Sequence, residues 1–363
     1  MDIKRRLLNE WFFICLLIVY AGLLIYNPRF LNPNFVDTDT VLIIAALIIS
    51  NTGIFVSGGT DLIATKILSR FKDIKSVSVA AIILTVVISM FITNDASLII
   101  FVPLTVSIGK MAKKSISRTI VLEAIGANVG SALMPFGNPQ NIILFRGYGL
   151  SAQSFFAGSI PLFLILLAVL LAFSLVLTKS SSITRRKWKA SFNPWLFYVS
   201  LVLFFLGVAG FFMGLGGYFF LGLSALSVLA LLTLRPRNYT VRNVLLRIDF
   251  FLILTFVLIF LVINSVRSII NIEIGGVLSV FLFSTLISQV ISNVPATVLL
   301  TGKTAFVPLL WGVNIGGNGT MVASLANLIA LRRSASGKVL DFMKISGLFL
   351  VVTAAIGALT FYI

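Results

Sequence analysis

The sequence predicts an all-α polytopic membrane protein built from two related halves that cross the membrane in opposite directions. Of its 363 residues, 59% are hydrophobic and 11% are charged, and the mean hydropathy is +1.10. A soluble domain could not cover so much apolar surface. Polar interruptions also occur in the middle of long apolar runs, and those of the first half recur in the second. Together these observations predict two inverted-topology repeats, each with a re-entrant helical hairpin and a broken transmembrane helix.

Composition excludes several classes of function. The formal net charge of +17 comes from Lys and Arg in short connectors between apolar runs. We therefore relate it to orientation in the lipid bilayer and expect no nucleic acid partner. The chain has no histidine, and its single cysteine, Cys15, lies in the first apolar run. Histidine-based hydrolysis, histidine-ligated metals and thiolate clusters are therefore excluded. We expect no enzyme and no cofactor, with at most Na⁺ or H⁺ as a coupling ion.

The first half comprises residues 1–178. The basic residues Lys4, Arg5 and Arg6 precede its first span, which predicts a cytoplasmic N-terminus. The predicted elements are spans at 11–26 and 41–56, an amphipathic surface helix at 60–72, a hairpin at 77–109, a broken helix at 119–147 and a span at 155–178.

A basic cytoplasmic linker, 179–193, leads into the second half, residues 194–363. The predicted elements there are spans at 195–213, 219–234 and 250–266, a hairpin at 276–310, a broken helix at 311–331 and a last span at 345–362. The count is nine crossings plus two hairpins. It predicts a multi-pass protein of the plasma membrane whose C-terminus lies outside.

The first hairpin is predicted from the interruption at Thr93, Asn94 and Asp95 between two apolar arms, 77–92 and 96–108. In hydrocarbon, an amide or a carboxylate costs several kcal/mol unless it is paired or faces water. Basic residues flank both ends of this segment, so both ends are expected at the cytoplasmic face. The three polar residues should then lie at a re-entrant tip, where non-helical backbone is surrounded by protein or a water-filled cavity.

The broken helix at 119–147 is predicted from residues 134–139, where two prolines and a glycine interrupt the helical hydrogen-bond ladder. In the second half, the corresponding break is the glycine-rich stretch 316–320.

The two halves match in sequence at both features. Residues 287–293 repeat residues 88–94, with Asn293 in the place of Asn94. Residues 127–141 align without gaps on 313–327, and three pairs are identical: Asn128/Asn314, Gly130/Gly316 and Asn141/Asn327. The second hairpin is flanked only by Arg267, Glu273 and Lys303, so it should open to the outside. Charge and repeat therefore agree on inverted topology.

Paired around a pseudo-two-fold axis, the tips and breaks would enclose a cavity at the membrane midplane. Helix N-termini there favour an anion, and freed carbonyls favour a cation. Asp95 breaks the symmetry because its counterpart is Val294, and we hypothesise that Asp95 binds the coupling ion, H⁺ or Na⁺. The plainer interpretation of one mid-membrane asparagine is helix packing. For Glu123, near a predicted span end, we expect snorkelling or an ion pair with a nearby Arg.

With these residues in view, the chain resembles the ion transporter superfamily, which includes arsenite-efflux permeases, divalent anion/Na⁺ symporters, citrate transporters and some Na⁺/H⁺ antiporters. Thr93-Asn94-Asp95-Ala96 with Pro103 downstream resembles the first hairpin of the arsenite-permease type. Ser292-Asn293-Val294-Pro295 resembles the second hairpin, and 316–327 its broken span. The likeness runs from about residue 41 to the C-terminus.

The resemblance implies a homodimeric secondary transporter in which a scaffold domain holds the dimer and a mobile domain carries the substrate by an elevator movement. Any coupling Na⁺ would lie near Asn94, Asp95 and Asn141. The binding positions of the family map onto Thr93, Asn94, Asp95, Gly137, Asn138, Asn141, Ser292, Asn293, Gly317, Asn318, Thr320 and Asn327.

The chain departs from the dicarboxylate branch, which has Ser-Asn-Thr at both hairpin tips, because Asp95 and Val294 occupy the third positions. The sequence predicts a small inorganic or organic anion or oxyanion as substrate: arsenite-like, sulfate-like or carboxylate. The alternatives are a Na⁺/H⁺ antiporter, or a channel-like permease that works with a separate ATPase subunit, since this chain has no nucleotide-binding loop.

Overall fold

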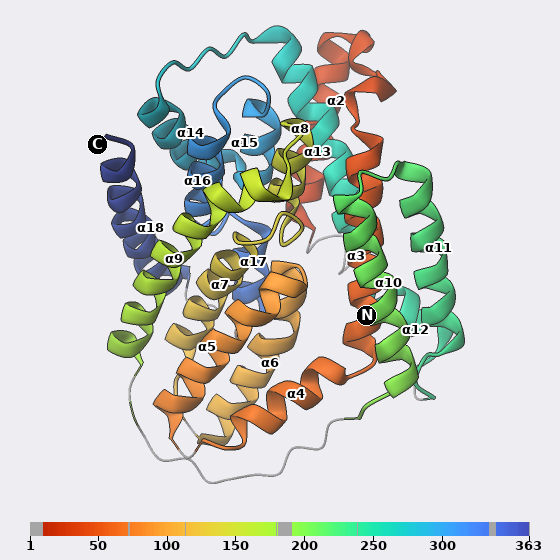
Figure 1. Ribbon diagram of the computed structural model, residues 1–363, viewed down its shortest axis with the longest axis vertical. Helices are drawn as coiled ribbons and strands as arrows, with labels where there is room; N and C mark the ends of the chain where they lie inside the picture. Colours follow the sequence, from red (N-terminus) through yellow and green to blue (C-terminus); the bar gives the residue numbers. More distant parts are fainter. Residues whose placement is uncertain are drawn as a thin grey trace.

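The structure, a computed structural model, describes residues 10–71, 73–112, 114–178, 180, 191–237, 239–333 and 339–362 (Figure 1). Throughout these ranges the regular elements are helices, and no strand occurs among them. Lys4, Arg5 and Arg6, and most of the linker 179–193, lie outside the described residues.

Six segments of the described chain are long and apolar enough to cross a membrane. Four shorter apolar helices accompany them: α2 (Trp11–Tyr26), α11 (Gly217–Thr233), α14 (Val277–Ile291) and α16 (Phe306–Gly316). The six are α3 (Thr38–Val56), α5 (Ile74–Phe91), α9 (Ala152–Leu177), α10 (Pro194–Phe212), α18 (Val339–Tyr362) and the segment that holds α12 (Val241–Leu245) and α13 (Phe250–Ile269). The chain is a multi-pass helical membrane protein.

The helices form two packing groups (Figure 1). In the first, α3 packs on α10 and α11, and α13 packs on α2. In the second, α5, α6 (Asn94–Ala112), α7 (Ser117–Ser131) and α17 (Leu325–Arg333) pack together, and α14 packs on α15 (Asn293–Leu300), α16 and α18. Helix α9 contacts α5, α7, α16 and α18 in this second group. The groups meet where α3 contacts α6 and α8 (Pro139–Gly147), and where α13 contacts α15.

The arms of the first hairpin are longer than predicted. Helix α5 covers residues 74–91 and α6 covers 94–112, against the predicted 77–92 and 96–108. Only Ile92 and Thr93 separate the two helices, because Asn94 and Asp95 already belong to the first turn of α6. The surface helix α4 (Gly59–Leu68) ends before the predicted residue 72.

The predicted second hairpin, 276–310, was too long. Helix α15 ends at Leu300, and α16 begins at Phe306, five residues before the predicted start of the broken helix at 311. Gly302 lies between them with a φ of +76°, a backbone conformation that favours glycine and ends a helix. Arg267 of α13 donates hydrogen bonds to the carbonyls of Val298 and Thr301, which the end of α15 leaves without helical partners.

Each segment predicted as a broken helix contains two separate helices. Residues 132–138 separate α7 from α8, and residues 317–324 separate α16 from α17. Each break therefore covers more residues than the predicted 134–139 and 316–320. Helix α8 begins where Asn138 accepts a hydrogen bond from the backbone N–H of Asn141 and Pro139 occupies the first helical position.

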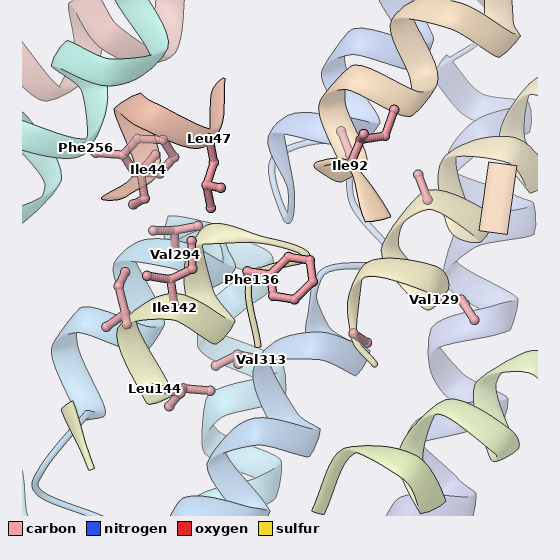
Figure 2. Close-up of a cluster of buried hydrophobic side chains, with 14 of the residues drawn as sticks. Ile44, Leu47, Ile92, Val129, Phe136, Ile142, Leu144, Phe256, Val294 and Val313 are labelled. Atoms are coloured by element: carbon pink, nitrogen blue, oxygen red, sulfur yellow. The ribbon is translucent and has the colours of Figure 1, made fainter. Parts of the chain in front are cut away.

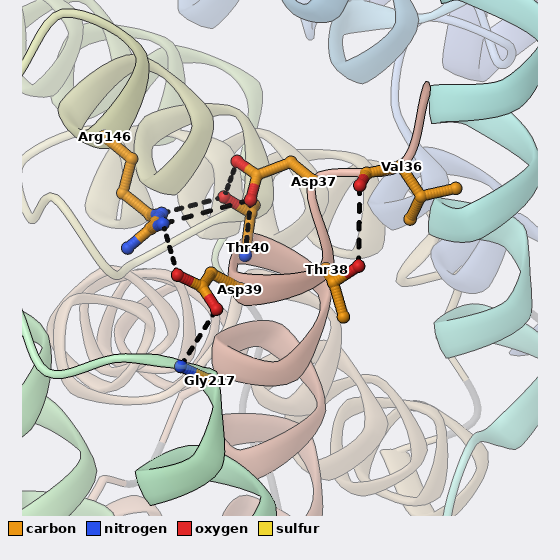
Figure 3. A network of polar contacts seen from close by, with 7 residues as sticks. All are labelled: Val36, Asp37, Thr38, Asp39, Thr40, Arg146 and Gly217. Carbon is orange, nitrogen blue, oxygen red and sulfur yellow. Dashed lines mark hydrogen bonds and ion pairs between the residues drawn. The ribbon is translucent and has the colours of Figure 1, made fainter. Parts of the chain in front are cut away.

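A polar network ties the end of α8 to the first packing group (Figure 3). Arg146 lies 3.2 Å from a carboxylate oxygen of Asp39 and donates a hydrogen bond to Thr40 Oγ1. The other Asp39 oxygen accepts from the backbone N–H of Gly217, where α11 begins. Arg146 therefore joins α8 to α3 and, through Asp39, to α11.

Candidate functional site

An amide cluster forms where the two helix breaks meet, and its centre is Asn128 of α7. The Asn128 amide nitrogen lies 3.1 Å from the carbonyl oxygen of Gly317 and 3.3 Å from the side-chain oxygens of Asn318 and Asn327. Asn128 is 4% exposed. Residues almost 200 positions apart in the chain are thus joined by buried amide groups.

The same arrangement recurs around Asn314 of α16. Its amide nitrogen donates to Asn141 Oδ1 at 2.9 Å, and its oxygen accepts from Asn138. In the sequence alignment of the halves, Asn314 corresponds to Asn128 and Asn141 to Asn327. Asn128 of the first half therefore donates to Asn327 of the second, and Asn314 of the second half donates to Asn141 of the first. The two bonds join equivalent positions.

Asn141 and Asn327 also hold the two breaks in shape. The Asn141 amide nitrogen donates to the carbonyls of Ser131 and Met134, and the Asn327 nitrogen to the equivalent carbonyls of Gly317 and Thr320. Each break frees backbone carbonyls from the helical ladder, and a buried carbonyl without a donor is costly. One asparagine in each half supplies that donor.

The hairpin tips contact the cluster in different ways. At the first tip, Asn94 donates to Asn128 Oδ1 at 3.3 Å, and its own oxygen accepts from the backbone N–H of Asp95. At the second tip, the backbone N–H of Asn293 donates to the carbonyl of Ala323 at 2.9 Å. Ser292, with a φ of +77°, makes the turn that starts α15 there.

Gln289 and Thr320 extend the contact at the second tip. The Gln289 side chain donates to the carbonyl of Gly316 at 2.6 Å and accepts from the backbone N–H of Thr320 at 3.0 Å. The first tip is therefore bonded to α7, and the second hairpin is bonded to the second break.

The cluster is electrically neutral apart from helix ends. Four helices, α6, α8, α15 and α17, begin beside it, and their N-termini place partial positive charge there. Its side chains are amides and hydroxyls, which offer both donors and acceptors. No arginine or lysine of the described residues donates a hydrogen bond into it, and the described members are Asn94, Asn128, Ser131, Asn138, Gln140, Asn141, Asn314, Asn318, Ser324 and Asn327.

Asp95, the neighbour of Asn94, lines a pocket together with Thr93. The pocket is lined by Ile44, Leu47 and Ile48 of α3, Pro139 and Ile142 of α8, and Leu252 of α13. Asp95 is 8% exposed, and its Oδ1 has no hydrogen-bond partner among the described residues. A carboxylate oxygen is thus buried at the junction of the two packing groups.

Apolar side chains make up most of this junction. Figure 2 shows Ile44 and Leu47 of α3 near Ile142 of α8 and Val294 of α15, and all four belong to one buried core. Val294 is the counterpart of Asp95 in the repeat. At the second hairpin, the junction is thus formed by aliphatic contacts of Val294. At the first hairpin, it contains the carboxyl group of Asp95.

The structure brings together most of the predicted site residues. Asn128 and Asn314 join Asn94, Asn138, Asn141, Gly317, Asn318 and Asn327. Ser292 and Asn293 bond to Ala323 of the second break, and Thr320 of that break bonds to Gln289. Gly137 packs so closely that a Cβ there would lie 2.4 Å from the Ser131 carbonyl. Thr93 and Asp95 lie in the separate pocket. The suggested Na⁺ position near Asn94, Asp95 and Asn141 stays a prediction, as do the binding roles of all twelve.

Sequence reasoning left out Asn128 and Asn314, which bond to asparagines of the other half, and also Gln140, Gln289 and Ser324. The signal for the first two was available, because they are one of the three identical pairs in the aligned breaks.

Comparison with known proteins gives the family. Residues 11–308 match the family model described as citrate transporter. The transporter MJ0456 of Methanocaldococcus jannaschii is 34% identical over 357 residues, which cover 94% of this chain and 95% of the relative. Inner membrane protein YbiR of Escherichia coli is 31% identical over 347 residues, with 90% and 89% covered. A transporter named arsB from Dictyostelium discoideum is 24% identical over 144 residues, 40% of this chain and 25% of its own length. The chain is therefore a membrane transporter, not an enzyme, and belongs to the citrate transporter family of the ion transporter superfamily.

Proposed function

We propose that this protein is a secondary active transporter that binds a small anion or oxyanion in the amide cluster. The observation that carries the proposal is the paired bonding of Asn128 with Asn327 and of Asn314 with Asn141. A buried polar site at the meeting point of discontinuous helices, built from both halves of the chain, is typical of secondary transporters. The chain has no histidine, and the described residues hold no group of three or more Cys, Asp and Glu that could bind a metal.

The two halves, 1–178 and 194–363, form inverted repeats in this proposal. Their equivalence in hydrogen bonding supports it, and so does the packing of two glycines. A Cβ on Gly130 would meet the carbonyl of Val86 and Ser89 Oγ, and a Cβ on Gly316 would meet the equivalent carbonyl of Thr285 and Ser288. Each hairpin thus packs on its broken helix at the same positions.

The second packing group is the mobile domain of an elevator in this proposal, and the first is the scaffold. All residues of the amide cluster belong to the second group. Its contact with α3 and α13 is largely aliphatic, and the polar links that cross it are the Arg146–Asp39 ion pair and the Arg267 hydrogen bonds, which would have to break when the mobile domain slides. Helices α10 and α11 expose many large apolar side chains, which suit the bilayer and a homodimer contact.

The neutral lining favours a substrate of low charge. An arsenous acid molecule or a singly charged oxyanion would find donors at amides and helix N-termini. A citrate or sulfate ion would need more positive charge than the described cluster supplies.

One observation favours the Na⁺/H⁺ antiporter as a second candidate. Asp95 holds a buried oxygen without a partner, next to Thr93, in a pocket between the two packing groups. A carboxylate and a hydroxyl are oxygen ligands that suit a hard cation.

The test is a thermal-shift experiment on purified protein with arsenite, sulfate, phosphate, citrate, succinate, Na⁺ and Li⁺ at two pH values. A ligand at a hundredfold excess over its Kd stabilises the folded state by about 2.7 kcal/mol. We expect arsenite or a monovalent oxyanion to raise the melting midpoint, and Asn94→Ala or Asn293→Ala to abolish the rise. If only Na⁺ or Li⁺ raises it and Asp95→Asn removes the effect, the antiporter replaces our proposal.

A further inference from the structure

Glu123 of α7 is a fully buried carboxyl group, which corrects the expectation that it reaches a span end or pairs with an arginine. The residue is 0% exposed. Its Oε1 accepts a hydrogen bond of 2.5 Å from the hydroxyl of Thr105 on α6, and its Oε2 is buried without a hydrogen-bond partner among the described residues. The mechanism proposed above makes no use of this group.

Among the described side chains of the helices around Glu123, none forms an ion pair with it. Helix α7 packs against α5, α6, α9, α17 and α18, and α9 carries no titratable side chain. No ion pair in the described part of the chain reaches Glu123. The charged or titratable residues on the other four helices and on α7 itself are Lys75, Asp95, Lys110, Arg118, Arg332, Arg333, Asp341, Lys344 and Tyr362.

A charged carboxylate in this position would be expensive. Burial of an ion without a partner costs several kcal/mol, whereas a neutral acid needs only hydrogen bonds. The Thr105 hydroxyl donates to one oxygen, which leaves the other as the place for a proton. From this geometry we propose that Glu123 and Thr105 form a proton-binding site, occupied in this conformation and emptied when α6 separates from α7. The proton is then the coupling ion.

The site is linked to the amide cluster by the same two helices. Asn128 lies five residues from Glu123 on α7, a rise of about 7.5 Å, and Asn94 lies eleven residues from Thr105 on α6, a rise of about 16 Å. Both Asn94–Asn128 and Thr105–Glu123 are hydrogen bonds between α6 and α7. A substrate that moves Asn94 away from Asn128 therefore also acts on the bond that holds Glu123.

Pro103 gives α6 a place to bend between the two contacts. It lies inside the helix, two residues before Thr105, and it has no N–H to donate to the preceding turn. The tip of the hairpin can thus tilt on α7, and the tilt changes the water access of Glu123.

The first experiment asks whether Glu123 holds a proton and does not depend on any substrate. Infrared spectra of the purified protein at pH 7 are compared for the wild type, Glu123→Gln and Asp95→Asn. We expect a carbonyl band of a protonated carboxylic acid that Glu123→Gln lacks and Asp95→Asn retains. Thr105→Val should shift this band, because the carbonyl loses its donor. An unchanged band in Glu123→Gln would show that Glu123 is ionised and would overturn the proposal.

The second experiment asks whether that proton is coupled, and this step rests on the transporter function proposed above. Arsenite uptake into proteoliposomes is measured with and without a pH gradient. We expect Glu123→Gln to lose gradient-driven accumulation at least tenfold but to keep arsenite exchange. Accumulation equal to that of the wild type would exclude Glu123 as the coupling site. If the wild type moves no arsenite, the substrate proposal fails, while the infrared result still decides whether Glu123 binds a proton.

Discussion

The asparagines of the amide cluster could be predicted from the sequence as buried polar residues, but their bonding partners could not. Asn94 and Asn141 were predictable because a buried amide in an apolar run demands an explanation. Asn128 and Asn314 repeat in the same way, but their importance depends on partners in the other half of the chain. No local pattern states which amide meets which carbonyl. The sequence therefore predicts the residue type and the repeat, and only the fold gives the pairing.

Asn128→Ala should destabilise the folded protein. It removes the donor to Gly317 and the acceptor for Asn94, and both are buried. A buried polar group left without its partner costs about 1–3 kcal/mol. The free energy of unfolding should therefore fall by about 1–3 kcal/mol or more. Denaturant unfolding in detergent measures it. Asn271→Ala is the control, because Asn271 is exposed and bonds only to the exposed Glu273. Equal stability of the two variants would contradict the central position of Asn128.

At the scale of elements, the sequence located each interruption but not the length of the helices around it. Polar and glycine-rich stretches predicted both hairpins and both breaks. The end of α15 was not predicted, because residues 301–305 form only a short connection between two apolar helices. The predicted hairpin arm therefore continued to residue 310. A glycine with a left-handed conformation and the Arg267 hydrogen bonds end that helix, and Arg267 lies on a helix distant in sequence.

Gly130→Ala should loosen the packing of the first hairpin on its broken helix. The added Cβ would lie 2.1 Å from the carbonyl oxygen of Val86, which is backbone of α5 and cannot rotate away. Overpacking of this kind costs about 1–3 kcal/mol, so the melting midpoint should fall. Gly22→Ala is the matched control, since it is also helical and nothing lies within 4 Å of its added Cβ. A midpoint that drops equally in both variants would show that helix α5 does not approach α7 so closely.

At the scale of the molecule, the two packing groups do not follow the order of the chain. Helices α2 and α3 of the first half join α10, α11 and α13, and α14 to α18 return to the side of α5 to α9. Composition and hydropathy predicted a membrane protein with many spans, because they need no knowledge of contacts. The grouping required contacts between residues more than 100 positions apart. The distribution of Lys and Arg among the connectors, by contrast, predicts the orientation of the chain in the membrane without any knowledge of contacts.

That orientation gives the most direct test of the inverted repeats. In a Cys15→Ala background, Ser115→Cys reports the end of the first hairpin, and Asn271→Cys reports the segment before the second, both at exposed positions. Because clusters of basic residues flank both ends of the first hairpin, whereas only Arg267, Glu273 and Lys303 flank the second, we expect a membrane-impermeant thiol reagent to label Ser115→Cys from the cytoplasmic side alone. It should label Asn271→Cys from the outside alone. Labelling of both from one side would mean that the halves share one orientation, and the hydrogen-bond equivalence of Asn128 and Asn314 would then need another origin than inverted repeats.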